Sequence, residues 1–361
     1  TNAIAALETA DFAALKTAAV AGLSTNQVRA LTTDQIVALT TSEANALSSS
    51  QVAALSTDAI AAMQTADLSA LKTASFAGLT SNQVAALTTD QVKGLASAQF
   101  AAMSTSNIAN GLTTDQIVAM TSSQFASLST AQIGALSTNS IAAIETADIV
   151  GISTAGIAAL KSAQIAALVT DQIANLSTNQ VVALTTAGVA GLTTDQVVAL
   201  SSNQAASLST QQVAAFSTNA IAALETADFA ALKTAAVAAL STNQIRALTT
   251  DQIVALTTAN ANALTTSQVA NLSTDAIAAL QTADLAALKT SAIAGLSSIQ
   301  VAALTTAQVN TLSTATLVAL STANIANGLT TDQIVAMTSS QFASLSTAQI
   351  GALSTNSIAA I

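Results

Sequence analysis

The sequence has 361 residues, carries a net charge of −10, and contains no Cys, His, Pro, Trp or Tyr. Without His and Cys it lacks the usual transition-metal ligands, thiol nucleophiles and general bases, so we predict a protein that is not an enzyme and uses no cofactor or metal. The negative charge argues against nucleic acid as a partner, and no apolar run approaches the roughly 18 residues that a membrane-spanning helix needs.

From its first residues the chain repeats a unit of eight residues, here called an octad. A large apolar residue, the anchor, recurs at every eighth position from Leu7 to Met103. The register slips by one residue near Asn110 and Gly111, and a second slip falls near residues 327–328, at an Asn and a Gly. Self-similarity at a short fixed period indicates a repeat architecture.

The consensus octad is Leu, two Ser or Thr, a variable residue, Gln, Val or Ile, a variable residue, and Ala or Gly. A Ser or Thr followed three residues later by Gln is the pattern of a capping box, in which each side chain satisfies a backbone N–H at the start of a helix. The pattern therefore predicts one short helix, of about two turns, in every octad. The capping pairs that we single out are Thr32 with Gln35, Thr113 with Gln116, and Thr249 with Gln252.

Within an octad, the Val or Ile and the next anchor are three residues apart and share one helix face. Burial of these two side chains contributes roughly 3 to 6 kcal/mol, whereas ordering eight residues costs on the order of 12 kcal/mol, so octads must stack to fold. We predict an all-α solenoid of short helices, one per octad. The expected structural core includes Leu31, Ile36, Leu39, Leu112, Ile117, Leu248, Ile253 and Leu256.

A β-solenoid is the alternative fold, since Thr-rich repeats can also build one. The octad does not alternate apolar and polar residues, however, and Ala and Gln are poor strand formers. The number of octads in one coil is left open by the pattern. Asp34 and Asp58 are three octads apart, as are Asp171 and Asp195, and this spacing hints at three octads per coil.

A longer repeat overlies the octads. Residues 1–47 are nearly reproduced by residues 218–264, an offset that equals twenty-seven octads and one slip. We therefore predict a single continuous solenoid over 1–361, made of a super-repeat at 1–217 and an incomplete second copy at 218–361. Because the chain starts without Met and ends within an octad at Ile361, we expect it to be part of a longer protein.

Charged residues occupy few positions in the repeat. Glu8 and Lys16, repeated as Glu225 and Lys233, follow anchors one octad apart, and we predict inter-repeat ion pairs between them, each contributing at most about 1 kcal/mol. Asp34 and its equivalents lie at the second helical position, where the helix dipole favours negative charge. No calcium-loop motif occurs, so we interpret the carboxylates as capping groups and surface charge.

Two resemblances bear on function. The segment LTTDQVVAL, at Leu192 to Leu200, resembles the opening helix of TAL effector repeats but lacks their proline, second helix and base-reading loop, so it supports helix initiation and not DNA binding. Over the whole chain, the tandem LTTxQ(I/V)xAL pattern resembles segments of giant secreted or surface proteins of Gram-negative bacteria. That resemblance implies an extracellular or cell-surface adhesin, sheath or filament protein.

We therefore expect a structural subunit or segment of a bacterial filament, tube or sheath, which assembles with further copies of itself by stacking of repeats and by lateral polar contacts. Low charge favours such association. The alternative is an adhesin or ice-binding module that presents a repetitive Ser and Thr surface to a solid surface or a glycan.

Overall fold

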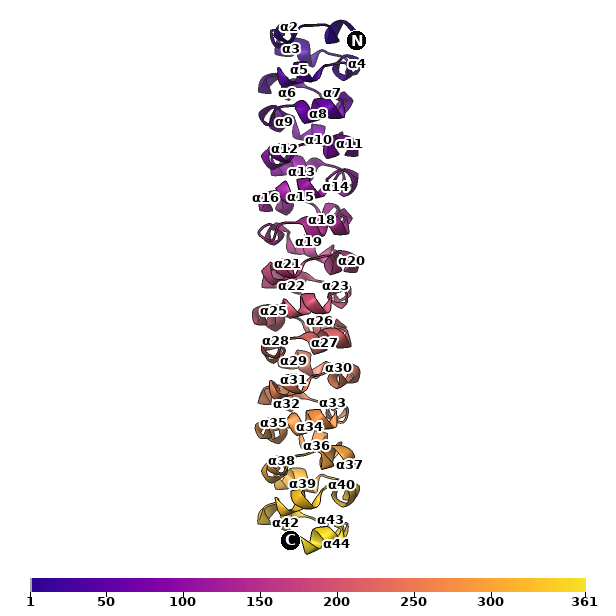
Figure 1. The fold of residues 1–361 in the computed structure, drawn as a ribbon, viewed down its shortest axis with the longest axis vertical. Helices are drawn as coiled ribbons and strands as arrows, with labels where there is room; N and C mark the ends of the chain where they lie inside the picture. The colour runs from indigo at the N-terminus through magenta and orange to yellow at the C-terminus, as the bar shows by residue number, and fades with distance from the viewer. Residues whose placement is uncertain (1) are drawn as a thin grey trace. The chain divides into compact units, whose positions relative to one another are not determined.

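The computed structural model describes residues 2–361 and consists of short α-helices separated by extended corners (Figure 1). The α-helices have four to six residues, somewhat less than the two turns expected. No strand occurs among the described residues, so the all-α solenoid is confirmed and the β-solenoid alternative is wrong. The chain forms two compact units, Thr1–Leu184 and Thr185–Ile361, and each has the architecture described below. That one solenoid continues through both units stays a prediction.

The first unit contains twenty-two α-helices and one 3-10 helix within its described residues. Their bounds are α1 Asn2–Ala5, α2 Thr9–Ala13, α3 Thr17–Ala21, α4 Thr25–Arg29, α5 Thr33–Val37, α6 Thr41–Ala46, α7 Ser49–Ala54, α8 Thr57–Ala62, α9 Thr65–Ala70, α10 Thr73–Ala77, α11 Ser81–Ala85, α12 Thr89–Gly94, α13 Ser97–Ala102, α14 Thr105–Asn110, α15 Thr114–Ala119, α16 Ser122–Ser127, α17 Thr130–Ala135, α18 Thr138–Ala143, η1 Ile149–Gly151, α19 Thr154–Ala158, α20 Ser162–Ala166, α21 Thr170–Asn175 and α22 Thr178–Ala183.

The second unit continues the same series of short helices. Their bounds are α23 Thr186–Ala190, α24 Thr194–Val198, α25 Ser202–Ser207, α26 Thr210–Ala215, α27 Thr218–Ala223, α28 Thr226–Ala231, α29 Thr234–Ala238, α30 Thr242–Arg246, α31 Thr250–Val254, α32 Thr258–Ala263, α33 Thr266–Val269, α34 Thr274–Ala279, α35 Thr282–Ala287, α36 Thr290–Ala294, α37 Ser298–Ala302, α38 Thr306–Thr311, α39 Thr314–Val318, α40 Thr322–Asn327, α41 Thr331–Val335, α42 Ser339–Ser344, α43 Thr347–Gly351 and α44 Thr355–Ala359.

Many of the helices begin with a capping box. At α5, the Gln35 N–H donates to Thr32 Oγ1 at 3.3 Å and the Thr32 N–H donates to Gln35 Oε1 at 3.1 Å. The same reciprocal pair forms at α15 and at α31, between Thr113 and Gln116 and between Thr249 and Gln252. These bonds satisfy amide groups that have no partner inside a helix, so each octad can start a helix of its own.

The corner between helices is built from two extended residues. After α6, Leu47 has φ −58° and ψ 136°, and Ser48 has φ −76° and ψ 159° before α7 begins. No described residue has a positive φ, and no described peptide bond is cis. An anchor followed by Ser or Thr therefore turns the chain without proline and without glycine in the left-handed region.

Three octads make one coil. Each helix packs on the helix three places further along the chain, as α5 does on α8, α12 on α15 and α31 on α34. The first residues of α5 and α8, Thr33 and Thr57, are separated by three octads, which is the spacing that recurs among the Asp residues. The coil is thus a triangle of short helices, and each side of the triangle stacks on the same side of the coil before it.

The glutamine of each capping box also ties its coil to the preceding one. Gln35 Nε2 donates to the carbonyl oxygens of Leu7 and Ile4, both at 2.9 Å, and Gln252 Nε2 donates to those of Ile221 and Leu224, both at 2.8 Å. These carbonyls lie at the end of the helix four octads earlier, at the corner that leads into the helix of the preceding coil, where few intrahelical donors remain. We call this arrangement the glutamine clamp, because one side chain satisfies the start of its own helix and the end of the helix four places earlier, which leads into the helix stacked on its own.

The glutamine clamp recurs along both units, and in each case Nε2 donates to the carbonyl oxygen of an anchor residue. In the first unit it is formed by Gln35, Gln51, Gln83, Gln91, Gln99, Gln116, Gln124, Gln132, Gln164, Gln172 and Gln180. In the second it is formed by Gln244, Gln252, Gln268, Gln300, Gln308, Gln333, Gln341 and Gln349.

The core of each coil consists of the anchor and the Val or Ile of each octad. All of the predicted core residues are buried, namely Leu31, Ile36, Leu39, Leu112, Ile117, Leu248, Ile253 and Leu256. The branched residue is fully buried, with 0% of its surface exposed at Ile36 and Ile253. The anchors at the corners have up to 9% of their surface exposed, as at Leu248. Hydrophobic burial therefore peaks inside the triangle of helices and decreases towards its corners.

The two register slips are absorbed by glycine. A Cβ atom at Gly328 would overlap the Asn324 carbonyl oxygen and lie 3.0 Å from Val301 Cβ, and Gly111 is crowded in the same way by Asn107. After the first slip, Gln116 donates to an anchor carbonyl 29 residues back instead of 28. The extra residue therefore fits into the corner while the clamp keeps its acceptor.

We expect Gln252→Ala to lower the free energy of unfolding by about 2 to 4 kcal/mol, because it removes a cap and two inter-coil bonds and leaves the Leu224 carbonyl without its donor. Gln252→Glu is the matched variant, since Glu43 accepts the Thr40 N–H at 2.8 Å in the same position and so preserves the cap. Urea unfolding followed by far-UV circular dichroism measures both. Parent-like stability of Gln252→Glu would show that the inter-coil bonds contribute nothing.

We also expect Gly328→Ala to be destabilising by about 1 to 3 kcal/mol, because the added methyl group has no room at the slip. Gly351→Ala is the control, as Gly351 lies in α43 with no atom within 4 Å of its Cβ position, and Ala should leave stability unchanged or raise it by up to about 1 kcal/mol. Equal effects of the two substitutions, measured by the same urea unfolding, would contradict a steric role for the glycine.

Candidate functional surface

The candidate functional features of the described residues are surface features and buried carboxyl groups. Nowhere in residues 2–361 do three Asp or Glu side chains come close enough to hold one metal ion. The helices of this part of the chain are all too short to span a bilayer. The features that remain are a strip of acidic side chains, exposed valines, a polar hollow, and a few carboxyl groups that the fold buries.

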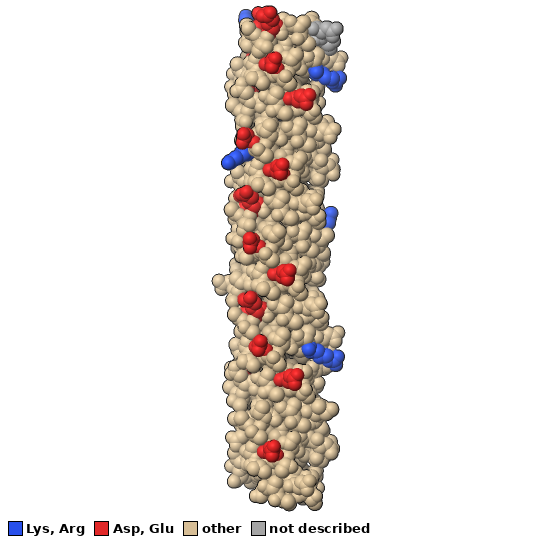
Figure 2. Space-filling model, viewed as in Figure 1, with Lys and Arg blue, Asp and Glu red and all other residues tan. Residues whose placement is uncertain are grey.

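Acidic side chains follow one another along the visible face of each unit, while Lys and Arg side chains lie mainly at its edges (Figure 2). In the first unit, Asp34 and Asp58 belong to α5 and α8, and Asp90 and Asp115 belong to α12 and α15, which form another side of the coil. Figure 1 shows α5 and α8 in the middle of the view, α12 to their left and α15 in the middle again. Successive coils are therefore rotated relative to one another. Because the aspartates move from one side of the coil to another along the chain, their carboxylates stay on one face.

Valine accompanies these aspartates. Val37 and Val118 are 45% and 43% exposed, and each lies three residues after an acidic residue of the same helix, Asp34 or Asp115. Residues three apart lie on one helix face. The second unit repeats the arrangement with exposed Val198, Val254 and Val335 after Asp195, Asp251 and Asp332. The acidic face therefore also carries apolar side chains that solvent reaches.

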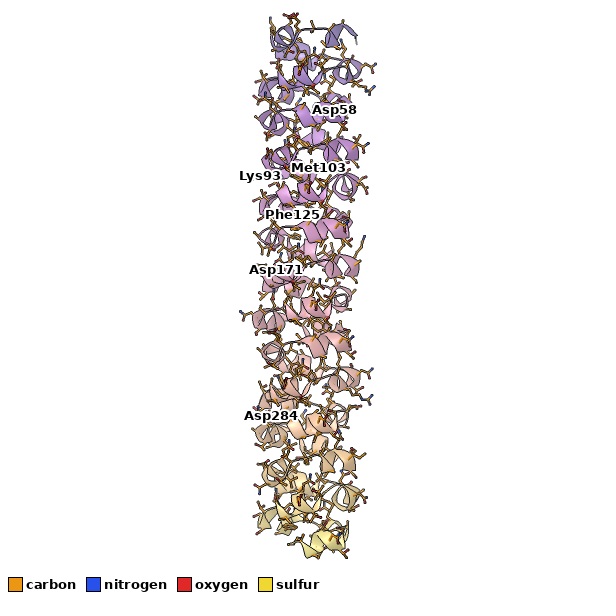
Figure 3. The ribbon with its side chains drawn as sticks, viewed as in Figure 1. Asp58, Lys93, Met103, Phe125, Asp171 and Asp284 are labelled. Atoms are coloured by element: carbon orange, nitrogen blue, oxygen red, sulfur yellow. The ribbon has the colours of Figure 1, made fainter. Side chains whose placement is uncertain are left out.

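A polar hollow of about 490 Å³ interrupts this face in the first unit. It forms where residues 145–152 make the 3-10 helix η1 instead of an α-helix. Ser122 Oγ donates to Asp148 Oδ1, and the missing Cβ of Gly151 lets η1 lie directly against the Ser122 backbone. Asp90, Glu145, Asp148 and Lys93 line the hollow, and Figure 3 places Lys93 at the left edge of the view. Its carboxylates can attract a cationic group from solution.

The predicted ion pairs do not form. No ion pair joins Glu225 to Lys233, or Glu8 to Lys16, although all four residues belong to the described part of the chain. Lys233 Nζ donates instead to the carbonyl oxygens of Ser207 and Leu208, at 3.1 and 3.2 Å. The physical reason is that these carbonyls close α25 and need donors, as do the ends of other short helices. Lys233 therefore acts as a positively charged version of the clamp.

Three aspartates that we expected at the surface are buried. Asp67, Asp228 and Asp284 replace Gln at the third helical position, and each is only 3 to 4% exposed. Burial raises the pKa of all three carboxyl groups above the ordinary 3.8, and a nearby glutamate raises it further at Asp67 and Asp228. At Asp228 the hydrogen bond from Ser202 opposes this rise in pKa. The interpretation as surface charge is wrong for these residues because the preceding coil covers the Gln position.

Comparison with known proteins gives a family. A family model described as the ALTTAQ repeat matches residues 4–41, 60–97, 110–138, 141–178, 174–202, 221–258 and 277–314, which together cover more than half of the chain. No curated protein matches. Among solved structures, the chain is similar to the leucine-rich repeat-containing protein LegL7 from Legionella pneumophila, with 13% identity, coverage of 68% of this chain and 77% of that chain, and a TM-score of 0.20. The chain thus belongs to the ALTTAQ repeat family, a family of tandem repeat proteins.

Proposed function

We propose that this chain is a structural segment of an extracellular bacterial filament, tube or sheath that assembles with further copies of itself. The observation that carries the proposal is the glutamine clamp. A coil is held by bonds to the coil before it and presents the same set of anchor carbonyls to whichever coil follows. Such an arrangement extends indefinitely by adding identical coils, as in other solenoids.

The surface supports lateral association of such segments. Only 7% of the residues are charged, so electrostatic repulsion between neighbouring copies is small for a chain of this length. When a neighbouring copy covers an exposed valine of the acidic face, burial of that side chain stabilises the contact by up to about 1.5 kcal/mol. Lateral contacts in the filament use this face. The extracellular location rests on the resemblance of the tandem pattern to bacterial surface proteins.

The alternative function is an adhesin or an ice-binding module. The hydroxyl groups at the start of the octads favour it, because Thr32 and Thr33, like Thr249 and Thr250, are exposed pairs that recur from octad to octad. A regular hydroxyl surface of this kind suits a glycan or an ordered water layer. In this case the isolated monomer would be the active species.

We expect the purified chain to form ordered filaments or tubes, seen by electron microscopy and by sedimentation.

The pair of substitutions Val37→Asp and Val118→Asp should abolish lateral association without changing the circular dichroism spectrum. The matched control is Ala131→Asp with Ala155→Asp, which adds the same charge at exposed second positions of α17 and α19. Assembly should survive the control. A dispersed monomer that binds a glycan or causes thermal hysteresis would instead establish the alternative.

A further inference from the structure

In a few octads a shorter side chain takes the place of the clamp glutamine. Asn324 still makes both contacts with the preceding coil, because its Nδ2 donates to the Leu296 carbonyl at 2.9 Å and its Oδ1 accepts from Ser298 Oγ at 3.2 Å. Asn107 makes the same pair of contacts with Leu79 and Ser81. In both cases the acceptor carbonyl lies 28 residues earlier and the serine 26 residues earlier. At Asn260, where Thr234 takes the place of that serine, Nδ2 is instead buried without a partner. A side chain of this length can therefore reach across the coil boundary, and it does so where a serine lies 26 residues earlier.

Asp228 has the same shape as asparagine and occupies the same position. Ser202, 26 residues earlier, donates its hydroxyl hydrogen to Asp228 Oδ1 at 2.7 Å. The other carboxyl oxygen, Oδ2, is buried and has no hydrogen-bond partner. By the register of the two asparagines, Oδ2 stands where an amide Nδ2 would face the anchor carbonyl of the preceding coil, which here belongs to Leu200. An ionised carboxylate would bring two acceptors together there without a hydrogen between them.

Asp284 shares the unpaired oxygen but has Thr258 in place of the serine 26 residues earlier. It is 3% exposed, and its Oδ2 is likewise buried without a partner. In the same register, the anchor carbonyl of the preceding coil belongs to Leu256. Asp284 is labelled in Figure 3 and belongs to α35. A carboxyl group in this position needs a donor on one of its oxygens, and a proton supplies it.

The charged groups around these two residues do not provide that donor. Around Asp228, Glu225 lies at the start of the same helix, α25 carries no titratable residue, α31 carries Asp251, and Lys233 already binds the carbonyls that end α25. Around Asp284, neither α32 nor α38 carries a titratable residue. Along the chain, the nearest charged residues are Asp275 of α34 and Lys289 at the start of α36.

We propose that Asp228 and Asp284 are proton-dependent clamps, in which the protonated carboxyl group donates from Oδ2 to the anchor carbonyl of Leu200 or Leu256. Burial, which raises the pKa of both groups, acts in the same direction. Since the folded-state pKa lies above the unfolded value of 3.8, their stabilising effect is complete below pH 3.8 and is lost as the pH rises through the folded-state pKa. These coil boundaries are therefore tightest in acid and loosen towards neutral pH.

The test is the double substitution Asp228→Asn and Asp284→Asn, which supplies the missing donor permanently. We expect the variant to melt at a higher temperature than the parent at about pH 7 and at the same temperature at about pH 3. Each pH unit between the folded and unfolded pKa of one carboxyl group corresponds to about a tenfold difference in the folding equilibrium constant. The reverse substitution, Asn324→Asp, should lower the melting temperature at neutral pH and leave it unchanged in acid.

The matched control is Asp251→Asn, at an exposed carboxylate in the first turn of α31. Loss of its favourable interaction with the helix dipole should lower the melting temperature at neutral pH or leave it unchanged, and should not raise it. The proposal is overturned if the double variant gains no stability at neutral pH, or if it gains equally at both pH values. It is also overturned if added calcium or sodium chloride stabilises the parent at neutral pH and not the double variant, because a cation would then occupy the position of the proton.

Discussion

The structure depends on one side chain that serves two helices at once. A helix of five residues leaves nearly all of its backbone groups without intrahelical partners, and helices this short do not form alone in water. The glutamine clamp resolves this at both ends, since Gln252 accepts the Thr249 N–H at the start of α31 and donates to Ile221 and Leu224 at the end of α27. Secondary structure and stacking are therefore formed by the same bonds, and neither persists without the other.

The narrow amino-acid alphabet follows from this constraint. A corner of two extended residues needs an anchor and a capping hydroxyl, so it needs neither proline nor glycine. Glycine is required at a few crowded places, such as Gly328 at the slip and Gly151 in η1. The side of the triangle is a short helix in which one branched residue fills the core. The twenty-seven octads of the super-repeat are a multiple of the three octads that make one coil within each unit.

Much of this fold could be predicted from the sequence, because local rules govern it. The pattern of Thr32 and Gln35 indicates where a helix starts, and the spacing of Ile36 and Leu39 indicates which residues are buried. The second role of glutamine could not be seen, because it depends on which segment of the preceding coil stacks beneath it. For the same reason Asp228 resembled a surface residue and Lys233 a partner of Glu225. The polar hollow depends on one octad that folds into η1, and its sequence closely resembles octads that fold regularly.

The clamp glutamines direct the hydrogens of their side-chain amide into the solenoid. Hydrogen exchange of side-chain amides, measured by NMR, tests this claim most directly. Gln211 is an internal reference, since it is exposed and lies next to the buried Gln212 in α26. We predict that the Nε2 hydrogens of Gln252 exchange as slowly as the backbone amides of the core. Exchange of Gln252 at the rate of Gln211 would show that the coils are held together by packing alone and would contradict the account.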